Sequence, residues 1–114
     1  MAEKDCIFCK IVAGKIPSGK VYEDDLAFAF RDISPQAPTH ILIVPKEHRA
    51  RLTDFGEKDA ALLGHLLKVV NIIAAQEKLE QFRVVINCGE DAGQTVWHLH
   101  VHLLAGRAFG WPPG

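Results

Sequence analysis

The stretch from Gln94 to Leu104 constrains the fold most, because polar and apolar residues alternate along it with a period of two. Such alternation is typical of a β-strand with one buried face, since successive side chains of a strand point to opposite sides. Every second position in the middle of this stretch is a histidine: His98, His100 and His102. The three imidazoles are therefore expected to share one face of a strand, while the apolar residues between them face the core.

The spacing of these histidines limits the chemistry they can perform. Residues two apart on a strand are separated by roughly 6.5 to 7 Å, and the outer pair by about 13 Å. One metal ion cannot bind all three rings, although two neighbours could bind a metal whose other ligands come from elsewhere. Imidazole titrates near neutral pH, so one neutral ring can act as a nucleophile while its neighbours donate hydrogen bonds. The row favours phosphate chemistry, and its structural alternative is a solvated strand face without a chemical role.

Composition predicts a single domain and excludes several classes of partner. A chain of 114 residues with 48% hydrophobic content forms one core, so residues 1–114 are expected to be one domain. The net charge of -1, with both signs mixed along the chain, gives no electrostatic footprint for a nucleic-acid polymer. The sequence lacks the apolar core of a signal peptide, and no run approaches the ~20 apolar residues of a membrane span. We expect a cytoplasmic protein without membrane contact.

Periodicity and turn residues predict two helices and five strands. They lie in the order helix 6–12, strands 21–23, 26–31 and 39–45, helix 57–79, and strands 82–88 and 94–104. Grouped helices and strands joined by tight turns indicate an α+β fold, here an antiparallel five-stranded sheet with one long and one short helix. Asp5 is the expected cap of the short helix. The long helix is apolar on more than one side, so one side is expected to pack on the sheet and another on a partner chain.

The cysteines are odd in number and two of them form the pattern Cys6-Ile-Phe-Cys9. Three cysteines without an export signal argue against a disulfide framework. A thioredoxin-like site would follow a strand, and nothing resembling a strand precedes Cys6, so redox catalysis is disfavoured. A zinc site would need two further ligands.

The sequence from His98 to Leu104 resembles the motif of the histidine-triad superfamily, in which three alternate histidines are followed by two apolar residues. The resemblance covers essentially the whole chain and is most similar to the Hint branch, the nucleoside phosphoramidate hydrolases. Its further matches are the segments Asp32 to His40, Pro45 to Lys46, Leu63 to His65, Gly93 to Val96 and Trp111 to Gly114.

This resemblance implies a histidine-triad fold and a hydrolase of purine nucleoside 5′-phosphoramidates. His100 resembles the nucleophile, which attacks the α-phosphorus and forms a covalent nucleotidyl-histidine that water then hydrolyses. His102 resembles the residue at the phosphate and the leaving amine, and His40 and His98 complete the imidazole network. No cofactor is expected to be required for catalysis.

The resemblance also implies a nucleotide-binding set. Asp32 resembles the acceptor of the ribose hydroxyls, which suits a carboxylate because it accepts two hydrogen bonds at once. The positions expected to line the phosphate are Asn87, Gln94, Thr95 and Val96. The apolar slot expected for the base consists of Ile7, Phe8, Ile11, Phe30, Ile33 and Leu42.

The chain departs from the branch at two positions, where Thr95 replaces the usual serine and Trp97 the usual tyrosine. Threonine keeps the hydroxyl group, but its methyl group could restrict the substrate. A homodimer is also implied, with the tail from Phe109 to Gly114 reaching the active site of the partner.

A structural zinc ion is a further expectation from the resemblance. Its four ligands would be Cys6, Cys9, His48 and His98. The alternative functions are a dinucleoside polyphosphate hydrolase, which the C-terminal tail argues against, a nucleotide-binding or protein-interaction module, and a metalloenzyme that uses a histidine pair.

Overall fold

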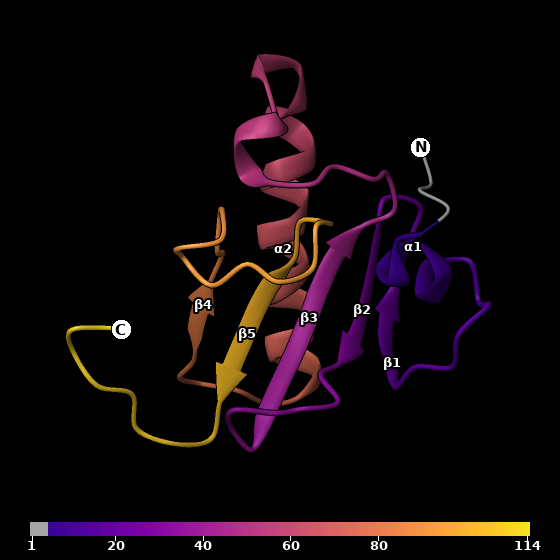
Figure 1. Ribbon diagram of the computed structural model, residues 1–114. Helices are drawn as coiled ribbons and strands as arrows, with labels where there is room; N and C mark the ends of the chain where they lie inside the picture. The colour runs from indigo at the N-terminus through magenta and orange to yellow at the C-terminus, as the bar shows by residue number, and fades with distance from the viewer. Residues whose placement is uncertain (1–4) are drawn as a thin grey trace.

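A five-stranded antiparallel sheet lies at the centre of the fold (Figure 1). The computed structural model describes residues 5–114, with the elements α1 (Ile7–Val12), β1 (Lys20–Glu23), β2 (Ala27–Arg31), β3 (Thr39–Pro45), α2 (Ala60–Gln76), β4 (Arg83–Val85) and β5 (Val101–Ala105). Two short 3-10 turns, Leu52–Asp54 and Glu57–Asp59, precede α2. The strand order β1-β2-β3-β5-β4, with one long and one short helix, confirms the predicted α+β fold.

Alternation along the strands gives the sheet two unlike faces. On one face, small and aliphatic side chains pack under α2: Ala27, Ala29, Ile41, Ile43, Val101 and Leu103. On the other face, larger apolar side chains pack against α1: Phe28, Phe30, Leu42 and Val44. The register pairs Leu42 with His102 and His40 with Leu104. Because Leu42 faces α1, both His40 and His102 must lie on that same face.

Helix α1 has six residues, which is too short to be stable alone, so tertiary contacts hold it in place. The ring of Phe8 packs edge-on against Phe30, with 5.4 Å between the ring centroids. Cys6 is the N-cap, and its Sγ accepts the backbone N–H of Cys9 at 3.3 Å. The predicted cap, Asp5, is therefore wrong by one residue, because the sulfur at the next position takes the orphan N–H group.

Helix α2 runs along the opposite face of the sheet (Figure 1). Its buried side is formed by Leu66, Val69, Val70, Ile73 and Ala74. The expected absence of a run long enough to cross a membrane is not confirmed, since Glu57–Gln76 has 20 residues and a mean hydropathy of 1.2. Length and composition alone do not separate such a span from the core helix of a domain, and this helix supplies the core.

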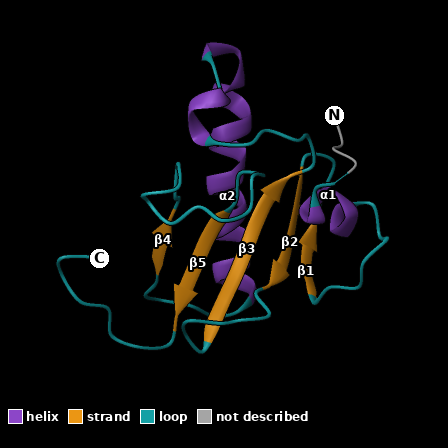
Figure 2. Cartoon of the chain, in the orientation of Figure 1, coloured by secondary structure: helices purple, strands orange, loops and turns teal. Residues whose placement is uncertain are grey.

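Two loops meet at the end of the sheet where β3 ends and β5 begins (Figure 2). The backbone N–H of Leu99 donates to the carbonyl oxygen of Arg49 at 2.7 Å. The buried side chain of Gln94 donates to the carbonyl of Ala50 at 2.6 Å and accepts the N–H of Gly89 at 2.9 Å. These bonds fix the segment that carries the histidine motif against the loop that follows β3.

The last two strands are shorter than predicted. β5 begins at Val101, so His98 and His100 precede it, and β4 covers Arg83–Val85 instead of residues 82–88. The chain bends at residues 96–98 to form the contacts with the neighbouring loop, which interrupts regular pairing. The two strands still pair antiparallel, as predicted.

Candidate active site and metal centre

The three histidines of the motif all contact the side of the sheet that carries α1, although only His102 belongs to a strand. Phe8 of α1 packs edge-on against the rings of His98 and His100, with centroid distances of 6.0 and 5.2 Å. The rings of His100 and His102 lie 4.8 Å apart. His98 is fully buried and turns away toward the cysteines, whereas His100 and His102 line a cavity.

The tautomer of His100 follows from one hydrogen bond. Its Nδ1 lies 2.8 Å from the carbonyl oxygen of His98. A carbonyl oxygen only accepts, so Nδ1 must carry the proton and donate it. In the neutral ring the lone pair is then on Nε2, which is the form that a nucleophilic imidazole needs.

A chain of hydrogen bonds fixes the tautomers of His40 and His102 in the same way. The backbone N–H of Gln36 donates to His40 Nδ1 at 3.0 Å, so the proton of the neutral ring is on Nε2. That proton is donated to His102 Nδ1 at 2.9 Å. The proton of His102 is consequently on Nε2, which is buried and has no hydrogen-bond partner within residues 5–114. A buried donor without a partner is costly, so this N–H is suited to a ligand.

Burial keeps these imidazoles neutral. It is the main reason that the pKa of His98 and that of His102 are both lowered to about 4. Burial also lowers the pKa of His40 and that of His100, although the carboxylate of Asp32 opposes the effect on both rings. At neutral pH the network therefore consists of uncharged rings whose donors and acceptors are set by their partners.

A cavity of about 550 Å³ opens beside His40, His100 and His102. Nine of the predicted nucleotide contacts line it: Ile7, Phe8, Ile11, Phe30, Asp32, Ile33, Leu42, Thr95 and Val96. Asp32 accepts the backbone N–H of Ser34 at 2.8 Å with one oxygen, and its other oxygen lies 3.5 Å from His40 Nε2. The cavity thus combines an apolar wall, one carboxylate and three imidazoles in defined tautomers.

Two predicted nucleotide contacts do not line this cavity. Gln94 uses its amide to join Gly89, Ala50 and the carbonyl of Val96, so it braces the loop beneath the site. Asn87 lies behind Gly93, and its side-chain nitrogen would be 3.7 Å from a Cβ at that glycine. The two neighbours of Gln94, Gly93 and Thr95, do line the cavity, so the motif predicted the segment correctly but not the direction of the Gln94 side chain.

The cavity also has lining residues that sequence reasoning missed. They are Pro17, Ser18, Arg31, Ser34 and Gln36. The run between Asp32 and His40, with its two prolines, was the available signal for Ser34 and Gln36. The contribution of Gln36 to His40 is made by its backbone N–H, which no residue pattern encodes.

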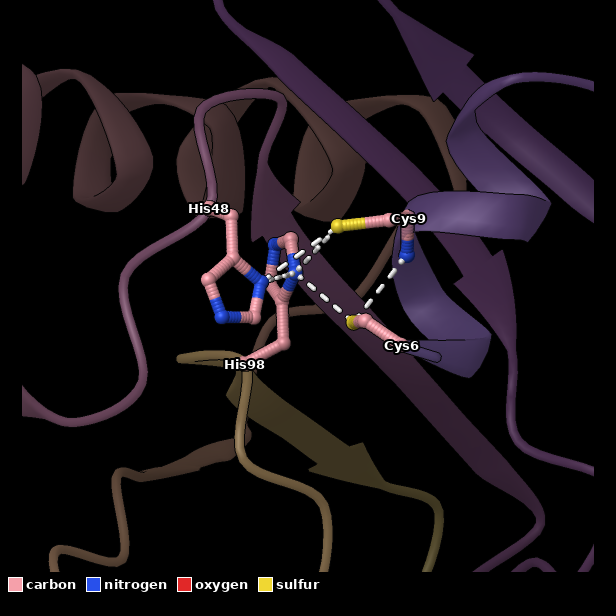
Figure 3. Close-up of side chains that lie close together, drawn as sticks. All are labelled: Cys6, Cys9, His48 and His98. Carbon is pink, nitrogen blue, oxygen red and sulfur yellow. Dashed lines mark hydrogen bonds between the residues drawn. The ribbon is translucent and has the colours of Figure 1, made fainter. Parts of the chain in front are cut away.

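The second cluster combines Cys6, Cys9, His48 and His98, which approach one another from three parts of the chain (Figure 3). Both cysteines belong to the start of α1, His48 lies in the loop after β3, and His98 precedes β5. His98 Nδ1 is 3.3 Å from Cys6 Sγ and 3.5 Å from Cys9 Sγ. His48 Nδ1 is 3.3 Å from Cys9 Sγ and 3.2 Å from His98 Nδ1.

These distances fit a tetrahedral zinc site. With usual bond lengths, two ligand atoms on one zinc ion lie about 3.6 Å apart for a sulfur and a nitrogen, and about 3.3 Å for two nitrogens. The tautomer fits as well, because His98 Nε2 donates to the carbonyl of Pro45 at 2.8 Å and leaves the lone pair on Nδ1. The residues present are therefore able to hold a zinc ion in a closed Cys₂His₂ shell.

A further group, Asp32, His40 and His102, also brings three potential ligand atoms together. It fits a metal poorly, because His40 Nδ1 accepts the N–H of Gln36 and Nε2 then carries the proton. A metal ligand must offer a lone pair, and His40 Nε2 would have to lose that proton first. This group is better described as part of the hydrogen-bond network.

Comparison with known proteins shows which family this chain resembles in sequence and in structure. The HIT domain family matches residues 13–109. An uncharacterized HIT-like protein from Synechococcus elongatus is 57% identical over 112 residues, which cover 97% of this chain and 98% of the relative. A 14 kDa zinc-binding protein from Zea mays is 53% identical over 111 residues, covering 95% of this chain and 87% of the relative. The crystal structure of a HIT family hydrolase from Legionella pneumophila superposes with a TM-score of 0.94 at 47% identity, covering 96% of this chain and all of the other.

Proposed function

This chain belongs to the HIT domain family and has the fold of HIT family hydrolases, and from that premise we propose that it hydrolyses purine nucleoside 5′-phosphoramidates. The reaction would proceed through a covalent nucleotidyl-histidine on His100. The observation that carries this proposal is the pair of matched tautomers, with a lone pair on His100 Nε2 and an unpartnered N–H on His102 Nε2. Together they offer a nucleophile and a hydrogen-bond donor to one phosphorus centre.

The proposed first step transfers the nucleotidyl group to the protein. His100 Nε2 forms a bond to the α-phosphorus while the bond from phosphorus to the leaving nitrogen breaks. The leaving nitrogen takes a proton from solvent before the bond breaks, so it departs as a neutral amine, and the imidazole of the adduct becomes positively charged. The bond from His100 Nδ1–H to the His98 carbonyl then becomes a charge-assisted hydrogen bond, which stabilises that charge. His102 Nε2–H donates to a phosphoryl oxygen in the same step.

The second step releases the nucleotide. Water attacks phosphorus, the bond to His100 Nε2 breaks, and the ring returns to its neutral form. The oxygen of water stays on the nucleoside monophosphate, and its surplus proton goes to solvent. Nothing in either step requires an additional cofactor.

The wall of the cavity supports a purine nucleotide as the substrate. Asp32 offers a carboxylate oxygen for ribose hydroxyls beyond the one that accepts Ser34 N–H. Ile33 is 97% exposed at the cavity, so an apolar surface is available to cover a planar base.

Intact-mass spectrometry of reactions quenched in base tests the covalent step, because a phosphorus–nitrogen adduct survives mild base and is labile in acid. With adenosine 5′-phosphoramidate, one nucleotidyl group is expected on the protein, and peptide mapping should locate it on His100. An adduct on another residue would contradict the assignment. Turnover of dinucleoside polyphosphates in preference to phosphoramidates would reassign the enzyme to the alternative substrate class.

A structural zinc ion is the second part of the proposal. The cluster of Cys6, Cys9, His48 and His98 has a fitting geometry, and relatives from Zea mays and Brassica juncea are named zinc-binding proteins. Zinc would bind the two sulfurs as thiolates and tie the start of α1 to the sheet. His100 keeps its own partner, the His98 carbonyl, so the metal would serve structure and leave the nucleophile free.

A homodimer is the third part. An apolar cavity of about 190 Å³ lies between α2 and the sheet, lined by Leu52, Leu63, Leu66, Leu67, Ile86, Leu99 and Val101. Leu67, one of these lining residues, is half exposed on α2, which suits contact with a second copy. The tail from Phe109 to Gly114 includes Trp111, which is 83% exposed and free to reach a partner. Sedimentation at micromolar concentration decides the point, and a fully active monomer would contradict the role of the tail.

A further inference from the structure

The peptide unit between His98 and Leu99, which we call the 98–99 peptide, forms hydrogen bonds with both of its polar groups. Its carbonyl oxygen accepts the proton of His100 Nδ1 at 2.8 Å. Its N–H donates to the carbonyl oxygen of Arg49 at 2.7 Å. The two groups of a trans peptide point in opposite directions and cannot rotate independently, because the unit is planar. The direction of the carbonyl that binds His100 is therefore set by the position of the Arg49 main chain.

The side chain of Arg49 anchors this main-chain position to the start of α2. Its guanidinium donates two hydrogen bonds to the carboxylate of Asp59, from Nη1 at 2.8 Å and from Nη2 at 3.0 Å. It also donates to Glu47 at 2.6 and 2.9 Å and lies 5.2 Å from the ring centroid of Phe55. Isolated exposed ion pairs stabilise little, but this pair is bidentate, partly buried and part of a network. Asp59 is the N-cap of α2, so the loop after β3 is tied to that helix.

The hydrogen bond from His100 Nδ1 contributes most while the reaction proceeds. In the proposed first step the imidazole becomes positively charged, so its bond to the His98 carbonyl is stronger in the transition state than with the bound substrate. An interaction that strengthens in the transition state raises kcat. Among the described residues, those that line the cavity beside His100 do not include Arg49 or Asp59. Support from this ion pair is therefore expected in kcat and not in KM.

We propose that the ion pair of Arg49 with Asp59 positions the nucleophile through the 98–99 peptide. The pair holds the Arg49 carbonyl, this carbonyl holds the N–H of the peptide, and the peptide presents its own carbonyl to His100 Nδ1. This inference rests on the proposed attack by His100 and adds two residues that support it from outside the cavity. Both are positioning residues, because their side chains act only through the main chain.

The test removes the ion pair from either side and uses adenosine 5′-phosphoramidate as the substrate. Arg49→Met keeps a long side chain without the guanidinium and should lower kcat about tenfold with KM changed by less than about twofold, because the reacting atom is slightly displaced. Arg49→Lys should restore part of the loss, since it keeps the charge but not the planar fork. Asp59→Asn keeps an oxygen for the N–H of Gly56 and should lower kcat by about threefold, since one of the two hydrogen bonds to Arg49 can remain.

A double variant and a matched control separate the proposed path from a general effect on the helix. Arg49→Met with Asp59→Asn should be about as slow as Arg49→Met alone, because both changes remove the same pair. Glu77→Gln is the control, since Glu77 is the C-cap of α2 and accepts from Arg31 Nη2 at 2.9 Å. It weakens an ion pair at the other end of the same helix and should leave kcat and KM unchanged.

Nuclear magnetic resonance follows the 98–99 peptide without relying on turnover. In Arg49→Met, the N–H of Leu99 should exchange with solvent at least about tenfold faster than in the wild type, because its acceptor is no longer held. The Nδ1 proton of His100 should move upfield, since a longer hydrogen bond shields the proton more. A residue that merely stabilised the fold would lower the melting temperature without these two local changes.

Each outcome bears on a stated proposal. A wild-type kcat in Arg49→Met, or a lower kcat with unchanged exchange at Leu99, would overturn the positioning role. Metal analysis covers the neighbouring cluster, because Arg49 follows His48, and a loss of zinc that accompanies the loss of kcat would also overturn it. A wild-type protein that does not hydrolyse the substrate would instead refute the proposed function, and the resonance measurements would still decide whether the ion pair holds the 98–99 peptide.

Discussion

His98 and His100 are separated by one residue, yet their surroundings give them opposite properties. His98 donates from Nε2 to the Pro45 carbonyl and presents the lone pair of Nδ1 to two sulfurs and an imidazole. His100 donates from Nδ1 to the His98 carbonyl and keeps its lone pair on Nε2 beside the cavity. Two histidines of one motif thus present opposite ring nitrogens, because a different carbonyl takes the proton of each ring, and this difference underlies the roles of metal ligand and nucleophile proposed for them.

Replacing the nucleophile gives the largest expected effect and tests one half of this contrast. His100→Ala should lower kcat by about a thousandfold or more, because the attacking atom is removed. Binding of adenosine monophosphate should persist, since the apolar wall and Asp32 remain. Calorimetry and steady-state kinetics measure the two quantities. Residual turnover above one tenth of the wild type would show that another group attacks.

Replacing both cysteines tests the other half. The Cys6→Ser, Cys9→Ser variant should lose the single zinc ion expected per chain and melt about 10 °C lower, because the metal no longer fixes α1. Cys88→Ser is the matched control, since Cys88 lies outside the cluster, and it should keep the zinc. Metal analysis of protein prepared without an affinity tag, with thermal melts, decides the matter. Full metal content in the double variant would place the ligands elsewhere.

Replacing Asp32 tests whether its carboxylate binds the ribose hydroxyls of the substrate. Asp32→Ala should raise KM for ribonucleotide substrates about tenfold, because a charged hydrogen-bond acceptor of the hydroxyls is lost. A 2′,3′-dideoxy substrate should respond little, since it lacks those hydroxyls. Parallel kinetics with both substrates provide the measurement. Equal losses on the two would assign Asp32 to the support of His40, whose Nε2 lies 3.5 Å away.

The pH profile gives the smallest effect and probes the neutral network. The pKa of His102 is lowered to about 4, chiefly by burial, so the ring stays neutral well below the usual 6.5. Activity should persist as pH falls through 6.5 and decline only toward 4, where a proton on Nδ1 of His102 would prevent it from accepting from His40. An acid limb near pH 6.5 in the kcat/KM profile would contradict this.

The stability of the fold should respond earlier than activity, and circular dichroism along the same pH series separates the two effects. Histidines with lowered pKa in the folded state leave the unfolded chain binding more protons below 6.5. The stability they contribute is fully present above that pH and is lost progressively as pH falls toward 4.

The parts of the fold that were predicted correctly follow from the pattern of apolar residues and prolines along the sequence. Strand β3 begins and ends at the predicted residues, Thr39 and Pro45, because it is a continuous apolar run bounded by prolines. The strand alternation predicted His98, His100 and His102 on one face of a strand, and this is confirmed for His102 alone, because β5 begins at Val101. The resemblance brought together the four residues of the second cluster, which lie far apart in the chain.

The parts that could not be predicted depend on where backbone groups lie in space. The tautomers of His40 and His100 are set by the N–H of Gln36 and the carbonyl of His98. Gln94 was expected at the phosphate, but three backbone groups of adjoining loops bind its amide instead. Such contacts form only after the loops have packed, so a pattern of residues in the sequence does not predict them.

The hydrogen-bond acceptor of His100 Nδ1 is a main-chain carbonyl group, that of His98. This limits which substitutions in evolution can alter the tautomer of His100. No substitution of His98 removes its carbonyl oxygen, so the proton on His100 Nδ1 is held by a main-chain group and not by a replaceable side chain. A descendant could exchange the cysteines and the His98 ring for other residues and still inherit a correctly oriented nucleophile. The proposed metal cluster is thus open to evolutionary loss, whereas the tautomer of His100 is inherited with the fold itself.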